Sequence, residues 1–92
     1  MIKTLHNLNR RFEDEINGKN ISSVVLKKTV EKIVRETLKI NQNLRWYECS
    51  LCNFDFSSSF SCGDIKDIDI VIDYCGEHTF AEVRIKGVPL AA

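Results

Sequence analysis

The feature that most constrains this chain is a pair of alternating segments near its end, residues 67–74 and 79–86. Every second position is apolar or uncharged, and the positions between carry most of the charged side chains. A period of two predicts a strand with one buried face, so each segment is expected to be a half-buried strand. The two residues Gly76 and Glu77 suit a type II′ turn, which prefers glycine first. The sequence therefore predicts an antiparallel β-hairpin.

A two-residue loop also fixes which residues face one another across the hairpin. The predicted apolar pairs are Ile68 with Ile85, Ile70 with Val83, and Ile72 with Ala81. The predicted polar pairs are Asp69 with Arg84 and Asp67 with Lys86. Apolar residues meeting on one face and opposite charges meeting on the other are what a correct register should give.

The first half of the chain reads as two helices. Apolar residues recur at intervals of three and four in a first stripe, Ile2, Leu5, Leu8, Phe12 and Ile16. Gly18 suits the end of that helix, and Ser22 or Ser23 can cap a second helix that runs to about Ile40. The apolar face of the second helix consists of Leu26, Val30, Ile33, Thr37 and Ile40, widened by Val34 and Leu38.

A second, earlier hairpin is expected around residues 49–52, with residues 44–48 leading in and residues 54 to about 60 leading out. The serine run at 57–59 leaves the far end of this hairpin open, and residues 87–92 break the strand pattern as a short apolar tail. At 92 residues, 43 % of them hydrophobic, the chain fits one domain. We expect an α+β fold: two N-terminal helices (1–43) packed on a four-stranded antiparallel meander (44–88).

Four cysteines and one histidine offer two sets of metal ligands. The first set is Cys49, Cys52, Cys75 and His78, and the second replaces His78 with Cys62. A spacer of two residues suits tetrahedral zinc, because both ligands of a pair can bend around one ion.

In a meander, the loops at 49–52 and 75–78 lie at the same end of the sheet, and Cys62 lies up to about 30 Å away if strand geometry holds throughout. This favours Cys49, Cys52, Cys75 and His78 as ligands of a structural zinc. If the serine run were a loop, Cys62 could return and the four-cysteine set would form. Two other interpretations stay open. In the first, the cysteines are reduced and simply buried. In the second, Cys49 and Cys52 form a redox pair, although no βαβ unit follows them as in thioredoxin-like proteins.

Charge is divided unevenly between the halves of the chain. Residues 1–45 carry ten Lys/Arg and five Asp/Glu, whereas residues 46–92 carry three and eight. The halves are therefore +5 and −5. A basic second helix, with Lys28, Lys32 and Arg35, could contact nucleic-acid phosphates, although such a face is usually just solvated. No apolar run reaches the roughly 18 residues of a membrane span, so we expect a cytoplasmic protein without a membrane partner.

Residues 68–87 resemble the central hairpin of the PD-(D/E)xK nuclease superfamily. Asp69 matches the metal-binding aspartate, Glu82 the glutamate, and Arg84 stands where the family has a lysine. The resemblance implies magnesium-assisted phosphodiester cleavage. The predicted cross-strand pairing accounts for Asp69 and Arg84 without a metal, so we keep the nuclease as an alternative to a protein that is not an enzyme.

The small size, the Ile/Lys/Asn-rich composition and the lack of a catalytic motif are similar in overall type to phage-encoded anti-CRISPR inhibitors, some of which are small metalloproteins. The resemblance implies a non-catalytic, zinc-stabilised module that blocks a CRISPR effector nuclease in the host cytosol by occupying its surface or its nucleic-acid groove. On this interpretation the partner surface comprises either acidic residues that mimic phosphates or the basic helix. The acidic candidates are Asp64, Asp67, Asp73 and Glu77, and the basic ones are Lys28, Lys32 and Arg35.

Overall fold

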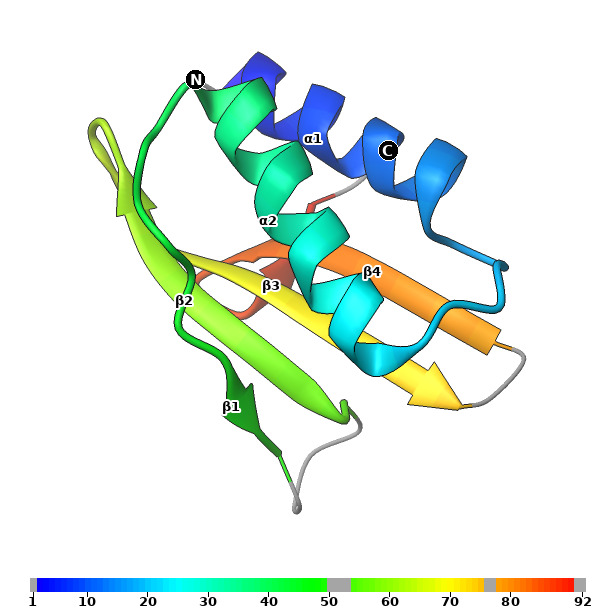
Figure 1. Ribbon diagram of the computed structural model, residues 1–92. Helices are drawn as coiled ribbons and strands as arrows, with labels where there is room; N and C mark the ends of the chain where they lie inside the picture. Colours follow the sequence, from blue (N-terminus) through cyan, green and yellow to red (C-terminus); the bar gives the residue numbers. More distant parts are fainter. Residues whose placement is uncertain (1, 50–53, 76–77, 91–92) are drawn as a thin grey trace.

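The structure is a computed structural model that describes residues 2–49, 54–75 and 78–90, with the backbone alone at Cys75 and His78. These residues form two helices and an antiparallel sheet of five strands (Figure 1). The helices are α1 (Ile2–Glu15) and α2 (Ser23–Leu38); the strands, which neighbour one another in chain order, are β1 (Tyr47–Glu48), β2 (Phe56–Cys62), β3 (Ile65–Cys75), β4 (His78–Ile85) and β5 (Val88–Pro89). The α+β class and the meander are confirmed, and the expected number of four strands is wrong by one.

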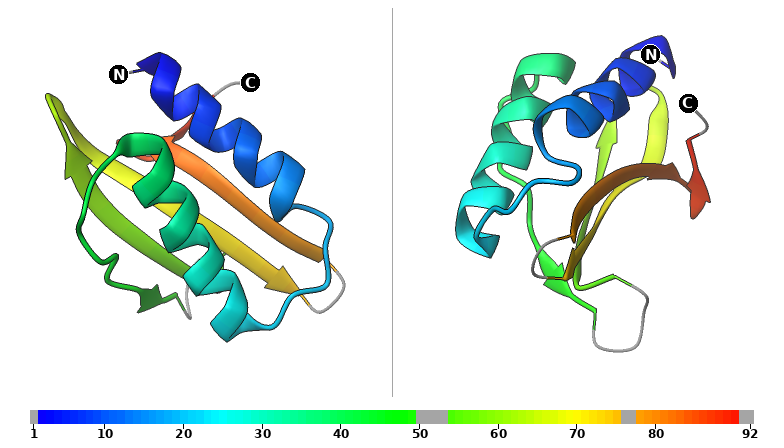
Figure 2. Two further views of the ribbon diagram at one scale, coloured as in Figure 1. Left: turned by 45° about the horizontal axis from the view of Figure 1, so that its top comes forward. Right: turned by 90° about the vertical axis from the view of Figure 1, so that its right-hand side faces the viewer.

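Both helices lie on the same face of the sheet, and the other face is left without a helical cover (Figure 2). The helix boundaries follow from local chemistry. The hydroxyl of Ser22 accepts a hydrogen bond from the Val25 N–H at 3.4 Å and caps α2, as predicted. Lys39 ends α2 in the left-handed conformation, with φ of 56°. Gly18, at φ of 78°, ends the turn after α1 and donates its N–H to the Thr79 carbonyl at 2.8 Å.

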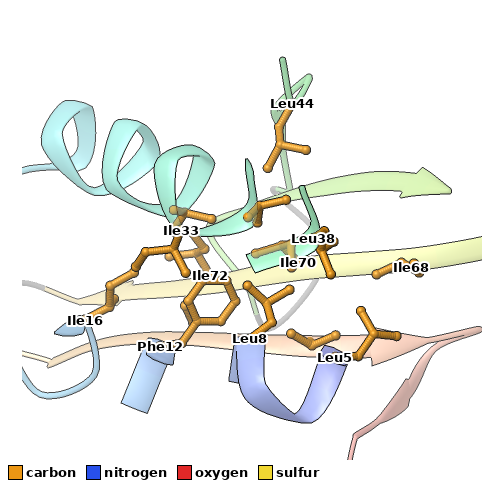
Figure 3. Close-up of a cluster of buried hydrophobic side chains, with 14 of the residues drawn as sticks. Leu5, Leu8, Phe12, Ile16, Ile33, Leu38, Leu44, Ile68, Ile70 and Ile72 are labelled. Carbon is orange, nitrogen blue, oxygen red and sulfur yellow. The ribbon is translucent and has the colours of Figure 1, made fainter. Parts of the chain in front are cut away.

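The core lies between the helices and the covered face of the sheet (Figure 3). Each predicted stripe supplies one side of it: α1 contributes Leu5, Leu8 and Phe12, with Ile16 just beyond, and α2 contributes Leu26, Val30, Ile33, Val34 and Leu38. From the sheet, the alternate residues Ile68, Ile70 and Ile72 point inward and are fully buried. Leu44 adds one more apolar side chain from the connection between α2 and β1, where a strand was expected.

The β3–β4 register confirms the prediction from the sequence. Cα partners include Ile68 with Ile85, Asp69 with Arg84, Ile70 with Val83 and Ile72 with Ala81. The ladder runs to a final pair of Cys75 with His78. The predicted Gly76-Glu77 turn itself lies outside the described residues.

The predicted pairing of Asp67 with Lys86 is wrong, because a bulge interrupts the sheet there. Between Phe60 and Cys62 the β2–β3 register shifts by one residue, and the extra residue belongs to β3. The bulge lies at Asp67, whose φ of 58° is uncommon for a residue other than glycine. Lys86 donates its backbone N–H to the Asp67 carbonyl at 3.0 Å, but the two are not ladder partners and form no ion pair.

The fifth strand replaces the expected tail. Lys86 and Gly87 both have positive φ, 51° and 78°, the combination that a type I′ turn requires. This turn brings Val88 opposite Ile85, so β5 pairs with the end of β4. Proline is tolerated in β5 because this short strand lies at the edge of the sheet.

Candidate functional site

The side of the sheet that carries no helix is called the open face below (Figure 2). Its members alternate with the core-facing residues of each strand: Tyr47, Ser57, Ser59, Asp69, Val71, Asp73, Phe80, Glu82 and Arg84. Val71 is buried although it lies on this face. Two large side chains project from it, Tyr47 at 51 % exposed and Phe80 at 46 %. The open face thus combines exposed aromatic side chains, which are enriched at protein interfaces, with carboxylates, which are not.

Arg84 sits at the centre of a small cluster on the open face. Its guanidinium stacks on the ring of Phe54, 4.4 Å from the ring centre, and lies 3.5 Å from the Glu82 carboxylate. Its Nε is buried and has no hydrogen-bond partner among the described atoms. The ion pair expected between Asp69 and Arg84 is therefore wrong, although the two residues are Cα partners. Glu82, two positions along the same strand, takes the guanidinium instead.

Asp69 has a different partner, the Ser59 hydroxyl, on the neighbouring strand β2. The three nuclease-like residues, Asp69, Glu82 and Arg84, thus share one face, as their spacing predicts. In the described part of the chain, however, no three His, Cys, Asp or Glu side chains group as a metal ion would need. Each of the three side chains already has a partner on this face.

The predicted acidic surface is divided by the structure into two places. Asp64 and Asp67 lie at one end of β3, beside the turn from β2, whereas exposed Asp73 lies near the other end. Six residues of strand separate Asp67 from Asp73, about 20 Å. Glu77 lies outside the described residues. The acidic candidates therefore do not form one compact patch.

A pocket of about 440 Å³ lies at the Asp64 end of the sheet. Apolar side chains of Ile2, Ile65 and Ile85 line it together with Asp64, Lys66, Asp67 and Lys86. The charged residues are two acids and two bases, so the pocket has no net preference for either sign of ligand.

The predicted zinc ligands lie at the opposite end of the sheet. Cys49 follows β1 on the open face, half-buried, and its Sγ is 3.5 Å from the Ser57 hydroxyl. Its backbone N–H donates to the Asp55 carbonyl. The Asp55 carboxylate in turn accepts a hydrogen bond from the backbone N–H of Tyr74, near the end of β3. Cys52 and the side chains of Cys75 and His78 lie outside the described residues.

Backbone topology nevertheless places Cys49 and the Cys75–His78 pair at one end, with β2 between them. Two strand spacings, about 10 Å, separate Cys49 from Cys75, and three spacings, about 15 Å, separate Cys49 from His78.

Cys62 lies at the other end of β2, buried, and pairs with Ile65. The serine run is strand and not loop, so the condition under which Cys62 would return to Cys49 is not met. Six residues of strand place Cys62 about 20 Å from the Cys49 end. Cys62 thus lies near the far turn, as expected, and its exclusion from the ligand set stays a prediction.

The basic residues of α2 form a ridge on the solvent side of that helix. Lys28 and Lys32 are exposed, and Arg35 donates to the Asn43 side chain at 3.0 Å. The neighbouring acids are engaged elsewhere: Glu31 accepts from the Trp46 indole N–H at 3.0 Å, and Glu36 pairs with Arg11 of α1 at 3.2 Å.

Sequence reasoning did not single out the aromatic residues of the open face. One signal was present: Phe80 stands in the polar positions of the alternation, between Thr79 and Ala81. A large apolar residue at a polar position of the alternation points away from the core, so the fold exposes it. Tyr47 carried no such signal, because the extent of β1 was uncertain.

A comparison with family models, with curated proteins and with solved structures found no match to this chain. Within the described ranges, neither helix has the length and apolar character needed to cross a bilayer.

Proposed function

We propose that this protein is a non-catalytic protein-binding module and that the open face of its sheet is the binding surface. The observation that carries the proposal is the exposure of Tyr47 and Phe80 among carboxylates on a face that no helix covers. Aromatic side chains of this kind supply most of the energy at protein interfaces.

The charges of this face favour a basic partner. Asp69 and Asp73 carry uncompensated negative charge, and Arg84, the one cation among the described residues of the face, is paired with Glu82. Carboxylates spaced along a strand resemble the phosphates that a nucleic-acid groove binds, and opposite charge accelerates the encounter. In the form implied by the resemblance to anti-CRISPR inhibitors, the partner is the groove of a CRISPR effector nuclease.

The test is binding to a purified, guide-loaded CRISPR effector, with DNA cleavage as a second readout. The double variant Asp73→Lys/Phe80→Ala should bind at least about tenfold more weakly, because it removes an exposed aromatic and reverses a charge. The matched variant Asn7→Ala/Asn20→Ala, on exposed residues away from the sheet, should bind like the unaltered chain. Equal binding by both variants would remove the open face from the interaction.

The nuclease alternative is tested in the same preparation. Magnesium- or manganese-dependent cleavage by the chain alone, abolished in Glu82→Ala, would replace the binding module with an enzyme.

We further propose that Cys49, Cys52, Cys75 and His78 hold a structural zinc that stabilises this end of the sheet. Support comes from the common end of the sheet at which Cys49 and the Cys75–His78 pair lie, and from the remote position of Cys62. Elemental analysis of protein purified without added metal should give about one zinc per chain. Cys75→Ser should lose the metal and Cys62→Ser should retain it; metal-free wild-type protein with an unchanged melting temperature would contradict the proposal.

The basic ridge of α2 supports a second candidate function, nucleic-acid binding. Glu31 bonds to Trp46 and Glu36 to Arg11, and within the described ranges Lys28 and Lys32 form no salt bridge. If the ridge binds DNA or RNA, affinity should fall steeply with salt. In Lys28→Ala/Lys32→Ala, the slope of log K against log salt concentration should decrease by the amount expected for about two phosphate contacts. A chain that does not bind at 50 mM salt would discard this candidate.

A further inference from the structure

The two edges of the sheet are treated differently by the rest of the chain. Along β4, α1 and the turn after it close the edge: the side-chain carbonyl of Asn17 accepts from the Ala81 N–H at 2.8 Å, and that of Asn9 accepts from the Val83 N–H at 3.4 Å. The Gly18 N–H bonds to the Thr79 carbonyl. Strand β5 then covers the remainder of β4. An edge closed in this way offers little to another strand.

Along β2, only two residues of the edge are paired. β1 reaches Phe56 and Ser57 and goes no further. The parity of the ladder follows from β4, where the Ala81 and Val83 N–H groups bond to Asn17 and Asn9 and therefore point away from β3. The hydrogen-bonded pairs of β3 with β4 are then at Asp69 and Val71, and those of β3 with β2 are Ile70 with Ser58 and Ile68 with Phe60. Such pairs recur at every second residue of an antiparallel ladder. The backbone groups of Ser59 and Ser61 must therefore point outward, where no described strand meets them.

The connection between α2 and β1 does not close this edge. It runs on the helix side of β2, where Leu44 is buried in the core (Figure 3). The Trp46 indole bonds to Glu31 of α2. Between residues 40–46 and β2, all of them described, there is no backbone hydrogen bond. Ser59 and Ser61 are both exposed.

β2 also lacks the features that usually protect an open edge. The strand contains no charged residue and no proline. The bulge at this end of the sheet places its extra residue, Asp67, on β3, so β2 itself stays regular. Nothing in the strand opposes the addition of a further chain.

The negative charge around the β2 edge favours one kind of added strand. Residues 46–65 contain three acids, Glu48, Asp55 and Asp64, and no lysine or arginine. Two copies paired through β2 would bring these acids together, whereas an extended segment flanked by lysine or arginine would meet opposite charge at both ends.

The geometry points to strand addition at this edge: a basic, extended segment of the partner protein pairs with Ser59 and Ser61 of β2. This inference rests on the proposed function as a protein-binding module and adds how the partner docks. Backbone hydrogen bonds supply the affinity in such complexes, and flanking side chains supply the specificity.

A peptide tests the inference without the partner. The probe is a seven-residue peptide of alternating threonine and valine with a lysine at each end, and the readout is amide hydrogen exchange together with NMR titration. In the free chain, the Ser59 and Ser61 amides should exchange fast while those of Ser58 and Phe60 are protected. Saturating peptide should slow exchange at Ser59 and Ser61 at least tenfold.

The decisive variant is Ser59→Pro, which removes an outward N–H and so should leave the β2–β3 ladder intact. It should raise the peptide Kd at least tenfold, while Ser59→Ala, which keeps the amide, should still bind; far-UV circular dichroism checks the fold of both. Ser61→Lys, which adds a charge to the edge without touching the backbone, should also weaken binding.

Three results would overturn the inference. The first is undiminished binding by Ser59→Pro and Ser61→Lys. The second is equal binding of a peptide with glutamate at each end. The third is protection of the Ser59 and Ser61 amides in the free chain, rising with concentration alongside a dimeric mass, which would make a second copy the occupant. If the chain binds the peptide but not the effector, the docking edge on β2 stands and the proposed function of the open face does not. The two proposals can therefore fail separately.

Discussion

The two faces of the sheet are made from the same strands but follow different rules. On the covered face, Ile68, Ile70 and Ile72 are wholly buried under the helices. On the open face, the intervening Asp69 is half-buried, Asp73 is exposed, and side chains find partners across strands or stay in solvent. Along β3, the buried isoleucines thus alternate with Asp69 and Asp73, and only Val71 among the intervening residues 69, 71 and 73 is buried. Mutations one residue apart on β3 should therefore separate stability from binding.

The sharpest form of the comparison uses two phenylalanines. Phe12 is fully buried and Phe80 is 46 % exposed. Phe12→Ala should lower the free energy of unfolding by about 3–5 kcal/mol, because it leaves a cavity in the core. Phe80→Ala should cost less than about 1 kcal/mol. Urea unfolding of both variants measures the gap; equal losses would show that the open face is itself a second core.

The next largest effect is expected where the helical layer joins the sheet. Asn17→Ala leaves the Ala81 N–H without its partner and should cost about 1–3 kcal/mol. Asn7, exposed on α1 with no side-chain hydrogen bond to the described residues, provides the control: Asn7→Ala should change stability by less than about 0.5 kcal/mol. Thermal melting distinguishes the two, and an Asn17→Ala protein as stable as the control would show that water replaces the amide.

Adjacent serines give a smaller contrast with the opposite sign. The Ser58 hydroxyl is buried on the covered face and has no hydrogen-bond partner among the described atoms, whereas Ser59 on the open face bonds to Asp69. Ser58→Ala should raise the free energy of unfolding by up to about 1 kcal/mol, because it removes an unsatisfied polar group. Ser59→Ala should leave it nearly unchanged. A destabilised Ser58→Ala protein would mean that its hydroxyl has a partner in solution.

The smallest expected effect concerns the outer surface of the helical layer. A hydrogen bond from Arg11 at 2.8 Å lowers the pKa of Glu15, and Arg11 also reaches Glu36 of α2. A lowered carboxylate pKa stabilises the fold at neutral pH, and this contribution is lost as the pH falls below about 4. Because the pair is exposed, it is worth less than about 1 kcal/mol. Wild type should therefore melt slightly above Glu15→Gln at pH 7 and together with it near pH 3; a gap that widens in acid would reverse the sign.

The sequence allowed the β3–β4 register to be predicted because a two-residue loop leaves one choice of pairing and the alternation agrees with it. It did not allow the partner of each charged side chain to be predicted. Asp69 and Arg84 are opposite one another, yet Arg84 pairs with Glu82 and stacks on Phe54, whereas Asp69 bonds to Ser59.

Two backbone features were missed for a different reason. The bulge at Asp67 and the turn at Lys86 both depend on positive φ at residues other than glycine, which no periodicity reveals. With Lys86 and Gly87 in a turn, Val88 and Pro89 become a strand too short to show alternation. The same limit applies to the candidate site, since exposed Tyr47 belongs to a strand of two residues.

The connection from α2 to β1 contains the chain's single tryptophan, Trp46. Its indole is half-buried, packs edge-on against Phe56 with ring centres 6.0 Å apart, and donates to Glu31. The protein thus carries its own optical reporter at the junction of helix, connection and edge strand. A ligand arriving beside β2 should shift the emission of this one fluorophore, so docking can be followed in real time without a label.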